Sequence, residues 1–333
     1  MEDKYKTVTR NLEEILVEDE LKHLLRTNPH PRVYCGYEVS GPVHLGHLAN
    51  IRKLIDFQKV GMKVIVLLAD YHTMLNLKGN LDWIEKMANY YKKTFLAVGL
   101  HHKKTTFVLG SKFEKKGEYF SDLLKLSLST TIIRGVRSMQ GVARDIENAH
   151  ISQMIYPLMQ ILDMKYLKVD AALGGMEQRK IHVLAREIID TVGWKKPVCL
   201  HNELLVSLQG PQSKMSSSLP HTVIQLHESP KEIRNKINNA YCPAKQIQGN
   251  PILQIVKMLV FPRFGEFEIK RKPKFGGDIK FDSYEGLEFT YKDGFLHPAD
   301  LKNAVSEYLI EMLRPVREYF KDNNEFLRPL YSK

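Results

Sequence analysis

The sequence predicts an α/β fold, a doubly wound and mostly parallel sheet followed by a mainly helical C-terminal domain. Two short apolar runs, RVYCGY (32–37) and MKVIVLLAD (62–70), enclose a stretch of helical period at 44–61. Strand, helix and strand in so short a span form a βαβ unit, in which the two strands lie parallel. The same alternation continues to about residue 202 and is then replaced by helical patterns.

The elements follow one another in order along the chain. NLEEILVEDELKHLLRT (11–27) has apolar residues at helical spacing, which predicts an amphipathic helix ahead of the first strand. The helix over 44–61 should end at Gly61, because glycine readily terminates helices. The run at 62–70 is apolar throughout, which is typical of a strand covered on both faces. The remaining expected elements are a helix (81–100), a strand (105–111), two or more helices within 117–167, a strand (167–173), a helix (177–190) and a last strand (196–202).

After about residue 220 the pattern is helical. SPKEIRNKI (229–237) places Ser229 and Pro230 where an N-cap and a first-turn proline are expected, and residues 297–323 predict a long helix. The expected organisation is a Rossmann-like domain (1–212) with an inserted helical segment at about 110–150, a loop and linker (213–228), and a mainly α-helical C-terminal domain (229–333).

The composition is that of a globular protein with a basic surface. The formal net charge of +11 fits a polyanionic partner, or simply a basic surface. The three cysteines, Cys35, Cys199 and Cys242, are far apart and form no C-x-x-C pair, which favours a reducing cytoplasm over a disulfide framework or a zinc site. The longest aliphatic run, at 64–69, is too short to span a bilayer, so no membrane partner is expected.

The first candidate site is GPVHLGH (41–47), in the turn after the first strand. A helix N-terminus presents free N–H groups and the positive end of the helix dipole, which favour anions. His44 and His47 would lie on one face of the first turn, and Gly46 would let a ligand approach the backbone closely. Phosphate binding and a pair of solvated histidines both fit this stretch taken alone.

Two further loops contain groups that could bind a nucleotide. SKMSSS (213–218) has one lysine and four hydroxyls, which suit phosphate binding or an ordinary polar linker. GGMEQRK (174–180) is a strand–Gly-Gly–helix turn whose acid, Glu177, could bind ribose hydroxyls. No G-x-G-x-x-G is present, so the dinucleotide-binding fingerprint is absent.

A polar stripe crosses the otherwise apolar segment QMIYPLMQILDMKYL (153–167). Tyr156, Gln160 and Asp163 are spaced i, i+4 and i+7, so they lie along one side of a helix that is apolar elsewhere. Such a helix is buried, and buried polar groups need hydrogen-bond partners. The three side chains either bond internally or line a pocket for a small polar ligand.

Together these motifs resemble the class I aminoacyl-tRNA synthetases, whose two signatures are matched by HLGH and KMSSS. Longer stretches look like the archaeal and eukaryotic tyrosyl-tRNA synthetases, in order and over nearly the whole chain: YCGYEVSGPVHLGH, LLADYHTMLN, IYPLMQILDMKYLKVDAALGGMEQRKIHVLARE, AYCPA, KFGGD and LHPADLKNAV. The resemblance implies a tyrosine–tRNA ligase. Such an enzyme activates L-tyrosine with ATP to tyrosyl-adenylate, releases pyrophosphate, and transfers tyrosine to the 3′ end of tRNA(Tyr).

The resemblance also implies which residues bind tyrosine. Tyr34 and Asp163 would bind the phenol hydroxyl, and a site built around that hydroxyl rejects phenylalanine strongly. The ammonium and carboxylate end would be held by Tyr156, Gln160 and Gln178, Gly36 would let the ligand lie against the first strand, and Leu67, Ala69 and His72 would shape the pocket.

For ATP, the resemblance implies that His44, His47 and Lys214 are the catalytic residues. They would stabilise charge on the phosphates while the tyrosine carboxylate attacks the α-phosphate, with Mg²⁺ neutralising the phosphates and no structural metal in the protein. The implied ATP contacts are His44, Gly46, His47, Glu177, Lys214, Met215, Ser216 and Ser217.

For tRNA, the resemblance implies two contact regions and a homodimer. Arg137, Arg179 and Lys180 match positions near the first base pair of the acceptor stem. Phe275 and His297 match residues that stack on the first anticodon base, and Asp300 one that bonds its edge. From residue type alone, Phe275 would instead be a core phenylalanine and His297 part of a helix N-cap region. The dimer interface is expected roughly within 110–150.

Three departures from the family pattern stand out. Leu219-Pro220 replaces the usual Lys-Gly after KMSSS, and proline should stiffen that hinge. Glu114 stands where glutamine is usual near the tyrosine pocket and adds a negative charge, and Val39 replaces a proline with no expected effect.

Three other functions compete with this interpretation. Tryptophan specificity is opposed by Tyr34 paired with Asp163. A cofactor-making nucleotidyltransferase can carry H-x-G-H but lacks a C-terminal RNA module. An inactive RNA-binding paralogue is opposed by the two intact signatures.

Overall fold

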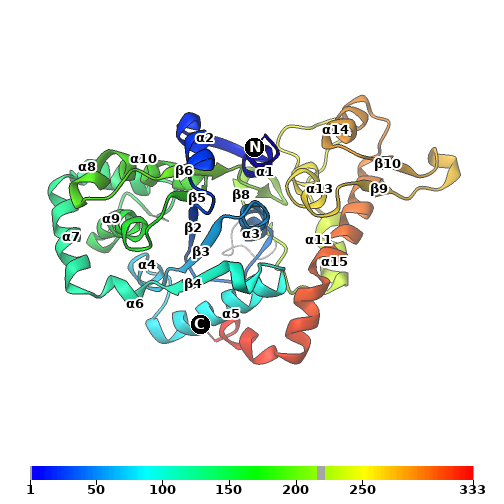
Figure 1. The fold of residues 1–333 in the computed structure, drawn as a ribbon. Coiled ribbons are helices and arrows are strands. Elements are labelled where there is room, and N and C mark those ends of the chain that lie inside the picture. Colours follow the sequence, from blue (N-terminus) through cyan, green and yellow to red (C-terminus); the bar gives the residue numbers. More distant parts are fainter. Residues whose placement is uncertain (1, 144, 216–221, 333) are drawn as a thin grey trace. The chain divides into compact units, whose positions relative to one another are not determined.

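The computed structural model describes residues 2–143, 145–215 and 222–332, which form two compact units (Figure 1). The first unit comprises residues 1–40, 53–203 and 328–333, and the second comprises residues 41–52 and 204–327. Helix α3 (Leu45–Lys59) begins in the second unit and ends in the first. None of the helices in the described ranges is long and apolar enough to cross a bilayer.

A sheet of six strands organises the described part of the first unit, in the order β1-β6-β5-β2-β3-β4. All pairs are parallel except β1 with β6. The predicted doubly wound fold is therefore confirmed, with its switch point between β2 and β5. The strands are β1 (Leu12–Leu16), β2 (Arg32–Tyr37), β3 (Lys63–Leu68), β4 (Thr105–Leu109), β5 (Ala171–Gly175) and β6 (Val198–Asn202).

The N-terminal segment differs from the prediction of one helix over 11–27. Residues Leu12–Leu16 form an antiparallel edge strand on β6, and α2 covers only Glu18–Thr27. Between them Val17 has a φ of 64°, which breaks both elements. Leucine and isoleucine at 12, 15 and 16 suit a helix or an edge strand. The open edge of β6 decides between them, because it supplies backbone hydrogen-bond partners.

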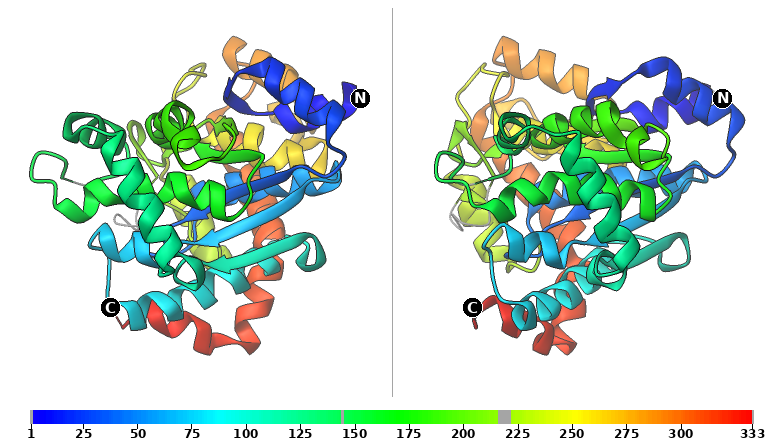
Figure 2. Two further views of the ribbon diagram at one scale, coloured as in Figure 1. Left: turned by 60° about the vertical axis from the view of Figure 1, so that its left-hand side comes forward. Right: turned by 90° about the vertical axis from the view of Figure 1, so that its left-hand side faces the viewer.

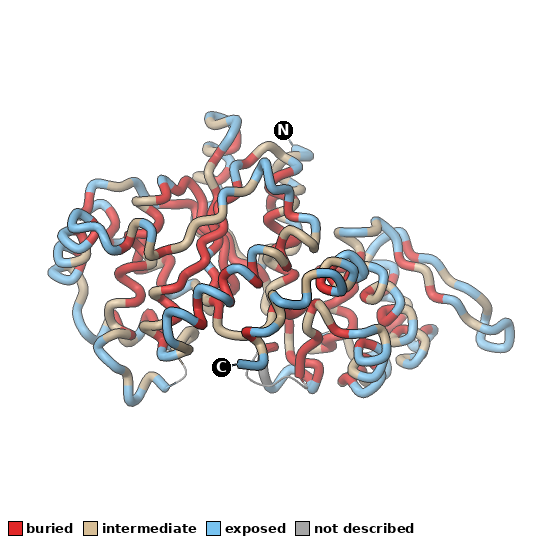
Figure 3. Tube along the Cα trace, turned by 90° about the horizontal axis from the view of Figure 1, so that it is seen from below, coloured by how far each residue is buried: buried red, intermediate tan, exposed pale blue. Residues whose placement is uncertain are grey.

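The helices of the first unit pack on the sheet through a shared core. One cluster joins Tyr34 and Leu67 of the sheet to Tyr119, Leu162 and Leu184 of three helices, α7, α9 and α10. The right-hand view of Figure 2 looks onto these helices, and Figure 3 shows in red which parts of the backbone are buried. The helices are α1 (Glu2–Thr9), α4 (Asp70–Leu75), α5 (Leu81–Ala97), α6 (Ser111–Glu114), α7 (Gly117–Leu128), α8 (Ile132–Met139), α9 (Ile151–Tyr166) and α10 (Arg179–Ile188).

The second unit is mainly helical, as predicted. Ser229 caps α11, since its hydroxyl accepts from the Glu232 N–H at 3.3 Å and the Glu232 carboxylate accepts from the Ser229 N–H at 2.8 Å. The elements are β7 (Val206–Ser207), β8 (Gly210–Lys214), α11 (Pro230–Asn238), α12 (Pro251–Ile255), α13 (Phe261–Phe264), β9 (Phe267–Ile269), β10 (Ile279–Phe281), α14 (Tyr284–Asp293) and α15 (Pro298–Asp322).

Candidate active site

The carboxyl-terminal half of β2, in the first unit, has one exposed residue, Gly36. Gly36 pairs with Leu67 of β3, and its strand lies in the middle of the sheet. Gly36 is nevertheless exposed. A Cβ at Gly36 would come within 3.6 Å of Tyr34 and 3.8 Å of Leu67. Glycine therefore leaves the surface of β2 accessible to a ligand that lies flat against it.

The polar stripe of α9 belongs to this region. Asp163 is completely buried and Tyr156 nearly so, and Gln160 donates a hydrogen bond to Gln178 at 3.0 Å. Gln178 is the last residue of a short 3₁₀ turn, Met176–Gln178, that follows β5. Burial raises the pKa of Tyr34, and the neighbouring Asp163 raises it further, so the phenol stays protonated as a hydrogen-bond donor.

Asp163 sits between a tyrosine and a histidine. The Tyr119 hydroxyl lies 2.9 Å from Oδ1 of Asp163 and shares its proton with the carbonyl oxygen of Met159, also at 2.9 Å. Oδ2 lies 3.5 Å from Nε2 of His72. Burial lowers the pKa of His72 to about 3, so the imidazole is neutral at physiological pH. Ala69, also buried, precedes α4, on which His72 stands.

Sequence reasoning missed several neighbours of this region. Burial raises the pKa of Tyr156, and Glu38 beside it adds to the effect. Glu38 itself accepts from Asn76 at 2.9 Å and forms an ion pair with Lys78. Tyr119, which bonds to Asp163, was also not predicted from the sequence. No local pattern distinguishes these residues from ordinary surface or core positions, because only the packing of α4, α7 and α9 brings them to the stripe.

The HLGH motif has a specific hydrogen-bond arrangement in the second unit. Nδ1 of His44 accepts from the Gly46 N–H at 3.1 Å, and Nδ1 of His47 accepts from the His44 N–H at 3.2 Å. Since each Nδ1 is an acceptor, a neutral ring carries its proton on Nε2. Burial lowers the pKa of His44, followed by the effect of His47, so His44 is neutral. Two Nε2–H donors therefore stand at the start of α3.

Glycine is required in the middle of this motif. A Cβ at Gly46 would lie 2.8 Å from Cε1 of His44, closer than real side chains approach, and 3.0 Å from its Nδ1. His44 forms an isolated β-bridge with Gln225, and the Leu45 N–H donates to the Ile224 carbonyl at 3.1 Å. These contacts hold the start of the motif in place. The orientation of His44 thus depends on the absence of a side chain at position 46.

The other predicted ATP contacts are only partly described. Met215 is buried, and its N–H donates to the carbonyl of Leu205 at 3.2 Å. Lys214 is the last residue of β8. Ser216, Ser217 and the Leu219-Pro220 departure lie outside the described residues. In the first unit, Oε2 of Glu177 is buried without a hydrogen-bond partner.

The basic residues predicted to contact the acceptor stem gather on two adjoining helices. Arg137 is exposed on α8, and Arg179 and Lys180 are exposed at the start of α10, which packs against α8. Lys180 bonds to Gln140 at the end of α8. Arg179 also pairs with Glu14 at 2.8 Å.

The residues predicted to read the anticodon are at the surface of the second unit. Phe275 is 56% exposed, so the alternative that it is a core phenylalanine is wrong. His297 caps α15, with its Nδ1 accepting from the Ala299 N–H at 3.1 Å, and Asp300 lies in the first turn. Arg271 connects the loop after Phe275 with the loop before His297, because its guanidinium donates to the carbonyls of Gly277 at 2.8 Å and Phe295 at 3.3 Å.

Comparison with known proteins identifies the family. Residues 26–314 match the family model of tRNA synthetases class I (W and Y). The chain is 48% identical to the tyrosine–tRNA ligase of Archaeoglobus fulgidus, over 95% of this chain and 97% of that protein. It is equally similar, at 48%, to that of Methanocaldococcus jannaschii, over 95% of this chain and 99% of that protein. The chain belongs to the tyrosine–tRNA ligase family.

The same conclusion follows from three-dimensional comparison. The crystal structure of the Archaeoglobus fulgidus tyrosyl-tRNA synthetase complexed with L-tyrosine matches with a TM-score of 0.93 and 47% identity, over 96% of this chain and 99% of that one. The chain is thus an aminoacyl-tRNA ligase of class I, a family that uses ATP as a substrate. The family resemblance inferred from the sequence is confirmed, and the nucleotidyltransferase alternative is wrong.

Proposed function

We propose that the chain activates L-tyrosine with ATP and transfers it to tRNA(Tyr). The observation that carries this specificity is that Tyr34 and Asp163 are both buried and close enough for the charge of Asp163 to raise the pKa of the Tyr34 phenol. The Tyr34 hydroxyl can donate to a phenol oxygen, and the Asp163 carboxylate can accept its proton. Phenylalanine would leave both groups without the hydrogen bond that the substrate hydroxyl supplies, which is costly in a buried site.

The other end of the substrate would be held by Tyr156, Gln160 and Gln178. The hydrogen bond between the two glutamine side chains supports this, since it orients both before a ligand arrives. The remaining pocket walls are Gly36, Leu67, Ala69 and His72, of which Gly36 is the exposed one.

In the activation step the tyrosine carboxylate attacks the α-phosphate of ATP in line, an O–P bond forms, and pyrophosphate leaves. His44 and His47 donate their Nε2–H groups to phosphate oxygens as charge builds up there. Glu177 binds the ribose, and the remaining ATP contacts are Gly46, Lys214, Met215, Ser216 and Ser217. Mg²⁺ would be held by phosphate oxygens and water rather than by this motif, because imidazole nitrogens are poor ligands for it. A terminal ribose hydroxyl of the tRNA then attacks the carbonyl carbon of the mixed anhydride, so that an ester bond forms and AMP leaves.

The tRNA would contact Arg137, Arg179 and Lys180 with its acceptor stem, and Phe275, His297 and Asp300 with its anticodon. The domains would be a catalytic domain (1–212), the KMSSS loop and linker (213–228) and an anticodon-binding domain (229–333). The protein would act in the cytoplasm.

A homodimer would form through the helical segment at about 110–150. In and beside this segment, large apolar side chains are exposed, from 53% at Leu124 to 89% at Leu128. Several large apolar side chains exposed on neighbouring segments are typical of a protein–protein contact. The side chains are Phe120, Leu124, Leu128, Ile132, Ile133 and Ile151.

Amino-acid-dependent ATP–pyrophosphate exchange, run with each amino acid in turn, tests the function. Exchange with tyrosine alone is expected. Exchange with tryptophan but not tyrosine would contradict the specificity, and tRNA binding without any exchange would favour an inactive paralogue.

Asp163→Ala tests the site itself. It should lower the tyrosine-over-phenylalanine ratio far more than it raises KM for ATP, because only the phenol end loses a partner. Asp122→Ala is the matched control, since Asp122 is a buried carboxylate paired with Lys165 on another part of α9. An unchanged ratio in Asp163→Ala would contradict the assigned role.

A further inference from the structure

Glu114, which stands where the family resemblance implies that glutamine is usual, is buried among other titratable groups. It ends α6, its side chain is 0% exposed, and neither carboxyl oxygen has a hydrogen-bond partner. Among the described residues its ion-pair neighbour is a histidine, with no lysine or arginine within reach. The groups that face it are Asp70 and His72 of α4, Asp163 of α9, Tyr119 of α7 and, beyond Asp163, Tyr34 of β2.

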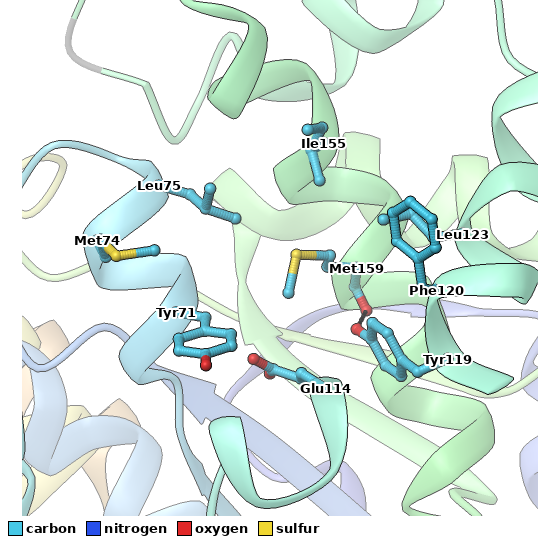
Figure 4. A pocket seen from close by; sticks show the side chains of 9 residues that line it. All are labelled: Tyr71, Met74, Leu75, Glu114, Tyr119, Phe120, Leu123, Ile155 and Met159. Atoms are coloured by element: carbon cyan, nitrogen blue, oxygen red, sulfur yellow. Dashed lines mark hydrogen bonds between the residues drawn. The ribbon is translucent and has the colours of Figure 1, made fainter. Parts of the chain in front are cut away.

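The surroundings of Glu114 offer little solvation. It lines a cavity of about 190 Å³ whose other walls are mostly apolar, and its carboxyl end points toward the ring of Tyr71 (Figure 4). Burial raises the pKa of Glu114 to about 10, and the neighbouring Asp163 contributes. At neutral pH this side chain is therefore a carboxylic acid with a proton to donate. The other lining residues are Met74, Leu75, Tyr119, Phe120, Leu123, Ile155 and Met159.

His72 lies between the two carboxyl groups. Its Nδ1 is 3.6 Å from Oε1 of Glu114, and its Nε2 is 3.5 Å from Oδ2 of Asp163. Each ring nitrogen therefore has one carboxyl as its neighbour, and one nitrogen or oxygen atom of each of the three side chains lies within 4.8 Å of the others. Small side-chain movements would close both gaps.

The position of the acidic proton follows from the partners of the two carboxyls. Their oxygens lie within 4.8 Å of one another, and two buried carboxylates this close cannot both be ionised without a cation. Asp163 has the Tyr119 hydroxyl as a donor, which stabilises its charged form, whereas Glu114 has none. Burial raises the pKa of Asp163 as well, but only Asp163 has a donor to its charged form, so the proton is assigned to Glu114.

We propose that Glu114 is a positioning residue for the tyrosine hydroxyl and acts through His72. The Glu114 O–H donates to Nδ1 of His72, so the single proton of the neutral ring is on Nε2 and is donated to Asp163. Asp163 is then the one anion of the group, held at Oδ1 by Tyr119 and at Oδ2 by His72. Its remaining lone pairs accept the substrate phenol. The inference rests on the proposed function, because it requires that Asp163 bind this hydroxyl.

The glutamine of the family pattern can play the same part. Its amide N–H would donate to Nδ1 of His72 and fix the same tautomer. A glutamate is equivalent to glutamine at position 114 only while it is protonated, which the apolar cavity and the nearby Asp163 ensure.

Two variants of similar shape test the chain of hydrogen bonds. E114Q keeps a donor and E114M does not. We expect KM for tyrosine in ATP–pyrophosphate exchange to change about twofold or less in E114Q and to rise about tenfold in E114M, the effect of one lost hydrogen bond. The tyrosine-over-phenylalanine ratio should fall in E114M alone, and KM for ATP should change in neither.

Infrared difference spectra of the wild-type chain and E114Q at pH 7 provide a readout that needs no substrate. The wild-type chain should show the carbonyl stretch of a protonated acid that E114Q lacks. A band that persists in E114Q would place the proton on Asp163, and an E114Q variant as impaired as E114M would mean that Glu114 acts as an anion; either result overturns the proposal. Failure of the proposed function would look different, since the wild-type chain would then show no tyrosine-dependent exchange.

Discussion

The hydroxyl of Tyr119 lies 2.9 Å from Oδ1 of Asp163, and both side chains are buried. Burial raises the pKa of Asp163, and the Tyr119 hydrogen bond opposes that rise. This contact favours the ionised form of Asp163 against the larger effect of burial, although Tyr119 is 44 residues away in the chain.

Tyr119→Phe should raise KM for tyrosine about tenfold, because Oδ1 of Asp163 loses its donor. KM for ATP should not change. The measurement is ATP–pyrophosphate exchange, and the control is Tyr166→Phe, which removes a hydroxyl bonded to Asp122 at 3.0 Å instead. Equal effects of the two substitutions would show that the Asp163 contact has no special role.

His44→Asn should lower the rate of tyrosyl-adenylate formation about a hundredfold, the usual effect of removing one donor to a developing oxyanion. The asparagine oxygen can still accept from the Gly46 N–H, so the start of α3 should stay intact, but no Nε2–H remains. Single-turnover kinetics measure the rate, and equilibrium binding should give an unchanged Kd for tyrosine. His30→Asn, at an exposed position, is the control. A higher Kd for tyrosine together with an unchanged rate of tyrosyl-adenylate formation would contradict this prediction.

Phe275→Ala should raise KM for tRNA about tenfold or more, because stacking of a base on an aromatic ring is lost. ATP–pyrophosphate exchange, which needs no tRNA, should be unaffected. Phe289→Ala removes another exposed ring, 65% accessible on α14, and should leave KM for tRNA unchanged. If both variants charge tRNA normally, Phe275 does not contact the anticodon.

Ile132→Asp should convert a dimer into a monomer, since a carboxylate would be buried without a partner in the proposed interface. Ile132 is 79% exposed in the single chain. Sedimentation velocity gives the oligomeric state. Leu81→Asp, at a 42% exposed position on α5, is the matched control. Identical sedimentation of both variants would place the interface elsewhere.

Acid should destabilise the chain through His182. Burial lowers the pKa of His182 to about 3, with a smaller contribution from His201, whose Nε2 lies 2.9 Å from Nδ1 of His182. The unfolded chain therefore binds a proton near pH 6.5 that the folded chain does not bind until about pH 3. Stability is unaffected by this group above pH 6.5 and falls as the pH drops below it, by about 2 kcal/mol at pH 5.

Urea unfolding at pH 7 and pH 5 measures this loss. His182→Asn should lose less free energy of unfolding between the two pH values than the wild-type chain, while His23→Asn, at an exposed position, should behave like the wild type. If the wild-type chain and both variants lose the same free energy of unfolding between pH 7 and pH 5, His182 is not the source of the acid sensitivity.

Local sequence was informative wherever a rule of short range applies. The βαβ unit, the stop at Gly61 and the Ser229 cap all depend on residues within a few positions of one another, and all three are present. The strand at Leu12–Leu16 was missed because its partner, β6, lies far along the chain. A helical spacing of leucines carries no information about an open sheet edge.

The sequence by itself determined the alternation of strands and helices, the helix start at the HLGH motif and the family to which the chain belongs, because each is encoded in contiguous residues. Tertiary structure alone decided which groups surround Asp163. Tyr119, His72 and Glu114 come from three separate helices, and only the packing of these helices brings them beside Asp163. Burial and electrostatics act through space, so protonation at this site is a property of the packed chain rather than of any motif.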